Sequence, residues 1–236
     1  MSNAQFVIDE LLSVADPEKA KFLQHFFKTG KGEYAEGDIF LGITVPIIRN
    51  IVKMTKELPL SEIQILVNSP YHEIRLSGFL FLVQQFKKSK SEDEKKDIFD
   101  FYLKNAKQAN NWDLVDVTCR DVIGAYLLNK KEKRSVLYRL AESSNLWEQR
   151  IAIISTWTFI KHHNFEDTLK LAEKLIDHKH DLIHKAIGWM LREVGKKDKS
   201  VLIDFLKIHT RKLPRTALRY AIEHFSSEEK VHFMTM

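Results

Sequence analysis

The chain has 236 residues, of which 44% are hydrophobic and 29% charged, and this composition is typical of a folded protein rather than a disordered one. Lysine and arginine exceed aspartate and glutamate by 37 to 32, so the net charge of +5 permits an anionic partner such as nucleic acid without requiring one. No apolar run reaches the roughly 18 residues that a membrane-spanning helix needs. A single cysteine, Cys119, excludes an internal disulfide and favours a cytoplasmic location.

The pattern of apolar residues indicates an all-α protein. Apolar residues recur at steps of three and four along most of the chain, and no run alternates as a β-strand would. Only eight glycines and five prolines occur, and half of the glycines fall in the stretch "FFKTGKGEYAEGDIFLG", residues 26–42. We expect a structured loop at about residues 28–42, followed by a helix with Pro46 in its first turn.

A weak repeat runs through the helical segments. Four of them begin with a short turn, a basic residue and an apolar helix, and "NNWDLVDVTCRD" (110–121) fits the gap in the series. Periods in the thirties to low forties indicate an α-solenoid of HEAT-like or armadillo-like repeats, which we expect to form one domain over residues 1–236. Equivalent positions would then line a concave basic groove suited to a phosphate backbone. They are Arg75, Asp116, Arg150, Lys185 and Arg215.

Tryptophans accompany this row of charges. Trp112 stands four residues before Asp116, and Trp189 stands four after Lys185, which places each pair on one helical face. Arg192 follows Trp189 by three residues. Each indole by itself is more simply explained as core packing with the charges solvated, but the combined pattern favours a functional site.

A carboxylate between indoles and within reach of arginine suits the stabilisation of a cation that forms in a transition state. Cleavage of the N-glycosidic bond of a cationic alkylpurine is such a reaction, and Arg150 would keep Asp116 ionised. The ten histidines show no metal-ligand spacing, and we expect them in loops or on the surface. Nucleotide-binding glycine motifs are also missing, so the sequence predicts no metal and no cofactor.

At these residues the sequence resembles the AlkD-type DNA glycosylases, which are bacterial HEAT-like repeat proteins of DNA alkylation repair. The resemblance rests on "WDLVD" (112–116), "LWEQRIAI" (146–153) and "KAIGWMLRE" (185–193), and it extends from about residue 17 to 225. It implies excision of 3-methyladenine and 7-methylguanine from double-stranded DNA in base excision repair, by a monofunctional hydrolase.

The resemblance also implies roles for individual residues. Asp116 matches the catalytic aspartate, Trp112 and Trp189 match the active-site indoles, and Arg150 matches the accompanying arginine. Arg192 matches a DNA-contacting arginine. The remaining expected DNA contacts are Lys185, Arg75, Arg215 and Phe27. Phe27 stands where the best-known branch has a tyrosine, and Thr158 stands where it has a lysine.

Two other functions remain open from the residues. One is a non-catalytic HEAT-repeat protein that binds damaged or distorted duplex DNA, which needs the basic row but not Asp116. The other is a protein–protein scaffold, which would show no salt-dependent affinity for DNA. We expect a monomer, because a groove for duplex DNA needs no second subunit.

Overall fold

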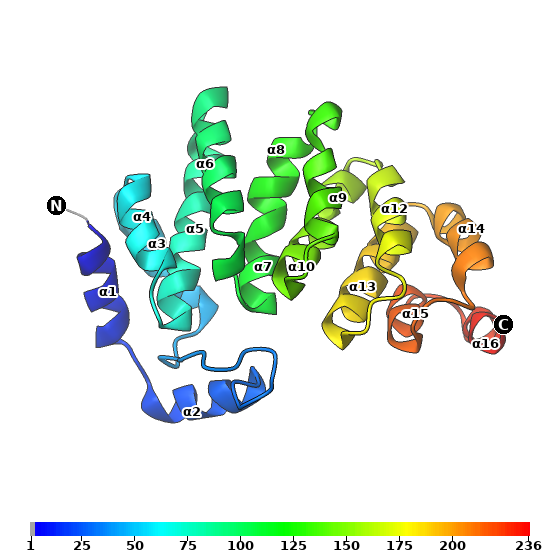
Figure 1. The fold of residues 1–236 in the computed structure, drawn as a ribbon, viewed down its shortest axis with the longest axis horizontal. Coiled ribbons are helices and arrows are strands. Elements are labelled where there is room, and N and C mark those ends of the chain that lie inside the picture. Colours follow the sequence, from blue (N-terminus) through cyan, green and yellow to red (C-terminus); the bar gives the residue numbers. More distant parts are fainter. Residues whose placement is uncertain (1–2) are drawn as a thin grey trace. The chain divides into compact units, whose positions relative to one another are not determined.

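The computed structural model describes residues 3–236, and these residues are helical with no β-strand. One isolated parallel bridge joins Ile39 to Tyr71. The chain divides into two compact units, one ending at Val122 and the other beginning at Ile123. The boundary lies inside a π-helical turn, Arg120–Gly124. Figure 1 shows the helices of each unit in chain order.

The first unit is built around one long central helix, α5. This helix is apolar on most of its circumference, as expected of a helix with neighbours on several sides, and it packs against α3, α4, α6 and α7. Side-chain caps at Asn3, Asp16, Ser91 and Asn111 fix where four of the helices begin. The α-helices of this unit are α1 (Ala4–Ser13), α2 (Pro17–Phe26), α3 (Val45–Met54), α4 (Leu60–Val67), α5 (His72–Lys88), α6 (Glu92–Lys104) and α7 (Trp112–Cys119).

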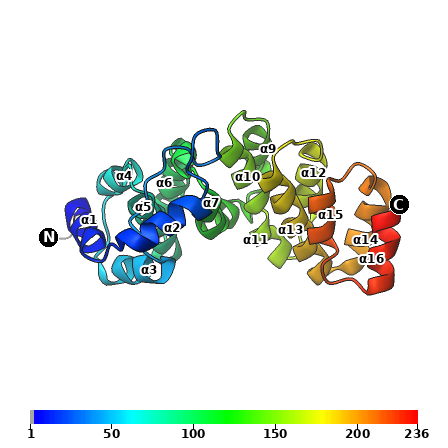
Figure 2. The same ribbon diagram turned by 90° about the horizontal axis from the view of Figure 1, so that it is seen from below.

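Helix α2 lies across the ends of α3 and α5, as the views in Figures 1 and 2 agree. The glycine-rich stretch follows it as a loop of turns leading to α3. Glu73 of α5 holds this loop, because its buried carboxylate accepts backbone N–H groups of Leu41 (2.8 Å), Gly42 (2.9 Å) and Ile43 (3.1 Å). Gly42 has φ +82, and a Cβ there would lie 2.1 Å from the Asp16 carbonyl oxygen, so only glycine fits.

The second unit is organised around α13 (Asp181–Lys197), which packs against α10, α12, α14 and α15. Gly188 allows the close approach of α13 to α15, since a Cβ there would lie 2.5 Å from the Ala217 carbonyl oxygen. The other α-helices of this unit are α8 (Ala125–Leu127), α9 (Ser135–Ala141), α10 (Leu146–Ile154), α11 (Trp157–Lys161), α12 (Glu166–Lys174), α14 (Lys199–His209), α15 (Arg215–Ala221) and α16 (Ser227–Thr235).

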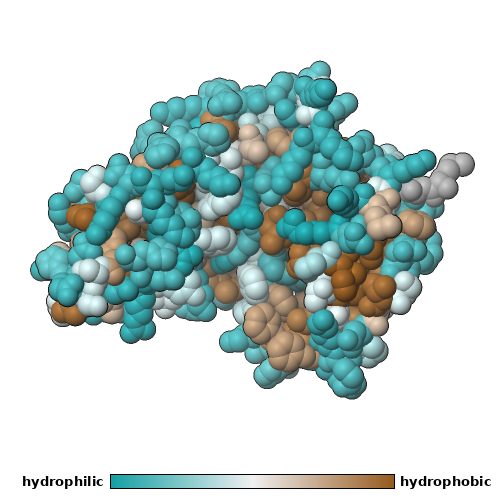
Figure 3. Space-filling view, turned by 180° about the vertical axis from the view of Figure 1, so that it is seen from behind, coloured by the Kyte–Doolittle hydropathy of each residue, from teal (hydrophilic) through white to brown (hydrophobic). Residues whose placement is uncertain are grey.

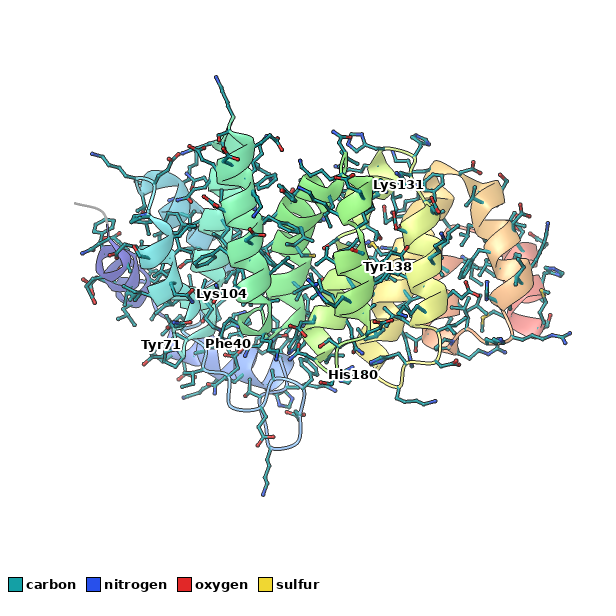
Figure 4. The ribbon with its side chains drawn as sticks, turned by 45° about the horizontal axis from the view of Figure 1, so that its top comes forward. Phe40, Tyr71, Lys104, Lys131, Tyr138 and His180 are labelled. Atoms are coloured by element: carbon teal, nitrogen blue, oxygen red, sulfur yellow. The ribbon has the colours of Figure 1, made fainter. Side chains whose placement is uncertain are left out.

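A buried ion pair joins α9 to α12 in the second unit, although two helices lie between them in the chain. Arg134, next to the start of α9, binds Asp167 of α12 at 2.8 Å, and Tyr138 donates its hydroxyl to the same carboxylate. Arg134 also binds the Leu127 carbonyl oxygen at 3.1 Å. Tyr138 and Lys131 are labelled on this part of the second unit in Figure 4.

Successive helices therefore pack on their chain neighbours within each unit, and the expected all-α, solenoid-type fold is confirmed. The expected single domain and its concave groove stay predictions. Across residues 3–236, no helix combines the length and the apolar character needed to cross a membrane.

Candidate functional site

Helix α7 carries the two residues that the sequence singled out first. It begins at Trp112, whose backbone N–H donates to the Asn111 side chain at 2.8 Å. Trp112 and Asp116 are four residues apart on this helix and therefore share one face. Both side chains are half-buried, so each has part of its surface within reach of a ligand.

A stack of four rings fixes the indole of Trp112. Its ring lies 5.1 Å from that of Phe27, Phe27 lies 4.9 Å from Phe40, and Phe40 lies 4.2 Å from His72, with interplanar angles of 20°, 20° and 21°. Phe40 comes from the glycine-rich loop, and Figure 4 labels it near Tyr71, the residue before α5. The stack thus joins α7 to α2, the loop and α5.

An ionic network closes the buried end of this stack. His72 Nδ1 lies 2.9 Å from Asp38 Oδ2, and His72 Nε2 lies 2.9 Å from Asp113 Oδ2. Arg75 completes the network with an Nη2 to Asp38 Oδ1 distance of 2.5 Å. With His72 protonated, two cations balance two carboxylates, as buried charges require.

The network stabilises the charged forms of its members. Burial favours neutral His72, but the charge of Asp113 and the hydrogen bonds to Asp113 and Asp38 outweigh it and raise the pKa of His72 to about 9. Burial likewise opposes ionised Asp38, yet the hydrogen bond from His72 and the charges of Arg75 and His72 lower the pKa of Asp38. At neutral pH the imidazolium is therefore clamped between two carboxylates.

Arg75 differs from the expectation that it lines a DNA groove. The residue is 4% exposed, and its guanidinium also binds the Asn110 side chain (3.1 Å) and the carbonyl oxygens of Ser69 and Pro70 (both 3.0 Å). These bonds and the Asp38 pair fasten the turn before α5 to the inside of the unit. A guanidinium so engaged serves the fold rather than a phosphate.

The five residues predicted to be equivalent in the repeats can be compared by their positions within their helices. Arg75 is the fourth residue of α5, whereas Asp116, Arg150 and Lys185 are each the fifth residue of α7, α10 and α13. Arg215 is the first residue of α15 and lies one helical turn away from this register. The equivalent residue is Arg219, which is exposed and which the sequence alignment missed.

In the second unit, Arg150 is buried, and its Nη1 donates to the Leu182 carbonyl oxygen at 2.5 Å. Trp189 and Lys185 of α13 are both half-buried, and Lys185 pairs with Asp181 at 2.8 Å. Arg192, also half-buried, pairs with Glu223 through Nη1, and its Nε lies 3.6 Å from Glu193 Oε1, which is too far for a hydrogen bond. The structure therefore keeps Trp189 and Arg192 partly accessible on one helix.

Phe27, expected to contact DNA, is buried inside the ring stack, so its direct role is to support Trp112. The aromatic residues that α2 exposes are instead Phe22 and Phe26. His72 also differs from the expectation of surface histidines, because it is 1% exposed. The contacts that bury Phe27 and His72 depend on the path of the glycine-rich loop, which the spacing of residues along the sequence does not predict.

An open cavity of about 290 Å³ separates α2 from α3 and α5. Its walls are mainly apolar and include Phe26 and Phe40, and Asp113 is one of its polar lining residues. Asp113 Oδ1 is buried, and none of the donors in residues 3–236 reaches it. Within the same residues no group of three histidine, cysteine or acidic side chains could hold a metal ion.

The fold and the half-buried Trp112–Asp116 pair define an α-solenoid protein with a candidate site on its repeat helices. Residues 7–225 match the family model described as DNA alkylation repair enzyme, and the chain belongs to this family. Among solved structures, a predicted DNA alkylation repair enzyme from Enterococcus faecalis is similar, with a TM-score of 0.71 over 90% of this chain and 97% of that chain. The two share 19% sequence identity, so this likeness shows the fold. A search of curated proteins gave no match.

Proposed function

We propose that the protein is an AlkD-type monofunctional DNA N-glycosylase that removes cationic alkylpurines, of the 3-methyladenine and 7-methylguanine type, from double-stranded DNA. Membership of the DNA alkylation repair family supports DNA as the partner and repair as the role. The observation that carries the proposal is the half-buried carboxylate of Asp116 on the same helical face as the half-buried, firmly packed indole of Trp112.

The proposed reaction breaks the bond between C1′ of the deoxyribose and the ring nitrogen of the alkylated base. The base leaves with the bonding electron pair and becomes neutral, because it was already cationic, so no general acid is needed. The sugar becomes oxocarbenium-like, and the Asp116 carboxylate stabilises this positive charge. Water adds to C1′ and releases a proton, which leaves an abasic site and the free base as products.

Trp112 offers the electron-rich face of its indole ring to the same developing cation. Its usefulness depends on a fixed orientation, since cation–π attraction is directional. The stack on Phe27 and Phe40 supplies that orientation, and the ionic network around His72 anchors the stack. Rings held at both ends lose little conformational freedom when a ligand binds.

Arg150 and Trp189 belong to the proposal because of the sequence resemblance, and each carries its own test. Exchange of Trp189 for leucine is expected to slow excision, and exchange of Arg150 for lysine removes the planar fork that a carboxylate or phosphate prefers. Lys185, Arg192 and Arg215 are proposed as DNA contacts. Arg75 and Phe27 are assigned to the fold instead.

The proposal is tested by incubating the purified protein with methylated duplex DNA and measuring the released bases by chromatography. The wild type should release 3-methyladenine or 7-methylguanine above the spontaneous rate. Asp116→Asn, which keeps the shape of the side chain, should lower the rate about 100-fold while duplex affinity stays close to that of the wild type. Asp100→Asn, which removes a carboxylate paired with Lys96 on the surface of α6, is the matched control.

Two outcomes would count against the proposal. Binding of duplex without any release by the wild type would identify a non-catalytic DNA-binding protein. Equal loss of binding and release in Asp116→Asn, together with a lowered melting temperature, would give Asp116 a structural role.

A further inference from the structure

Helix α2 exposes two phenylalanines that its own packing does not require. Phe22 is 65% exposed and Phe26 is 53% exposed, whereas Ala20 is the only buried residue of the helix. The two phenylalanines are four residues apart on one helical face, and their rings stack at 6.2 Å. Figure 3 shows hydrophobic surface at the lower edge of the molecule, where α2 and its loop lie.

This pair of rings is continuous with the candidate site. The ring of Phe26 meets that of Trp112 edge-on at 6.2 Å and that of Phe27 at 5.1 Å. Exposed and buried rings thus form one series that runs from Phe22 across the surface to the half-buried indole beside Asp116. A ligand seated against Trp112 would extend onto Phe26.

The stretch of chain that carries the two phenylalanines is basic. Between residues 19 and 31 the chain contains no aspartate or glutamate, and its ionisable side chains there are all exposed. Lys21 pairs with Glu18 just outside this stretch, at 2.7 Å. Aromatic rings set among cations are what single-stranded or unstacked nucleic acid binds, with bases on the rings and phosphates on the cations. The ionisable residues of the stretch are Lys19, Lys21, His25, Lys28 and Lys31.

We propose that Phe22 and Phe26 form a stacking wedge that enters duplex DNA at an unstacked base step beside the damaged nucleotide. The inference rests on the proposed function for the identity of the partner as damaged duplex. An apolar wedge offsets the cost of unstacking by covering the exposed base face, as in other proteins that kink DNA. A weakened or gapped step costs least to open, so the wedge favours damaged over intact sites.

The experiment compares the affinity for two short duplexes of the same sequence, one fully paired and one with a tetrahydrofuran abasic-site analogue. The wild type should bind the abasic-analogue duplex more tightly than the fully paired one. In Phe22→Ala/Phe26→Ala the ratio of the two affinities should fall about tenfold. Phe22→Tyr/Phe26→Tyr should retain it, because the rings remain. Ile65→Ala, which truncates a 52% exposed apolar residue of α4 in the same unit, should leave it unchanged.

Three results would overturn the inference. If the alanine double variant kept both its melting temperature and its preference for the abasic-analogue duplex, Phe22 and Phe26 would not act as a wedge. Full retention by Phe22→Leu/Phe26→Leu would show that ring stacking is not involved. A wild-type dimer in sedimentation that the alanine variant converts to monomer would show that a second copy of the chain covers this face.

Base release is measured separately on the same proteins. A wild type that excises nothing but prefers the abasic-analogue duplex, with this preference lost in Phe22→Ala/Phe26→Ala, would refute the proposed function and keep the wedge. A wild type that excises normally but shows no preference for the abasic-analogue duplex would refute the wedge and keep the proposed function.

Discussion

His72 links α5 to α7 through its Nε2 atom, which lies 2.9 Å from Asp113 Oδ2, the residue next to Trp112. Its other nitrogen binds Asp38 of the glycine-rich loop. One imidazolium therefore ties together three segments that are separate in the sequence. The orientation of Trp112, and with it the candidate site, depends on the charge of this buried ring.

The stability of the protein is accordingly expected to fall between pH 6.5 and 9. The pKa of His72 rises from 6.5 to about 9 on folding, so its contribution is fully present below pH 6.5 and is lost as the pH rises through 9. Integrated over that window, the shift corresponds to about 3 kcal/mol. The measurement is the free energy of unfolding in urea at a series of pH values.

His72→Gln is the control for this pH dependence, because it cannot titrate. The variant should be less stable at pH 6.5 and should show a shallower decline toward pH 9. A decline as steep as that of the wild type would assign the effect to other groups. On the acid side, the lowered pKa of Asp38 predicts stability that is present above pH 3.8 and lost below it.

Arg75 should be required for folding rather than for DNA binding. Arg75→Gln leaves Asp38 with one buried partner fewer, and breaking such a pair costs about 3 kcal/mol of unfolding free energy. Arg215→Gln removes the same charge from an exposed position, where the change should stay within about 0.5 kcal/mol. Chemical denaturation of both variants gives the comparison. A stable Arg75→Gln protein with weakened duplex affinity would restore Arg75 to the DNA contacts.

The sequence predicted the all-helical class because the three- and four-residue apolar period is local and persistent. It also placed Trp112 and Asp116 on one helical face correctly, since a spacing of four residues in a helix needs no tertiary information. The first helical turn at Pro46 followed from the same kind of local rule. Confirmed features are thus those that a single helix determines.

The burial of Arg75 could not be predicted in this way. A repeat register says which residues are equivalent, but it does not say which of them meets a counter-ion inside the protein. The carboxylate that pairs with Arg75 comes from Asp38, which lies 37 residues earlier in an irregular loop. His72 was misjudged as a surface residue for the same reason, because both of its partners are distant in sequence.

The glycine of "KAIGWMLRE" gives the last prediction. Gly188 sits in the middle of α13, where glycine is unfavourable for a helix, yet alanine should be worse. An added Cβ would lie 2.5 Å from the Ala217 carbonyl oxygen and 2.5 Å from the Tyr220 Cβ, both atoms on or next to the backbone of α15. Gly188→Ala should therefore separate α13 from α15 and lower the unfolding free energy by about 2 kcal/mol.

Gly195→Ala in the same helix is the matched control. Its new Cβ would meet mainly the Leu202 side chain, with the nearest atom Cδ2 at 2.4 Å, and that flexible end can rotate away. Helix propensity then favours alanine, so this variant should be close to neutral or slightly more stable. Thermal unfolding of the two variants separates the effects. Equal stability of both would show that α13 and α15 pack less tightly than their close approach at Gly188 implies, and the fixed position of Trp189 beside that glycine would lose its physical basis.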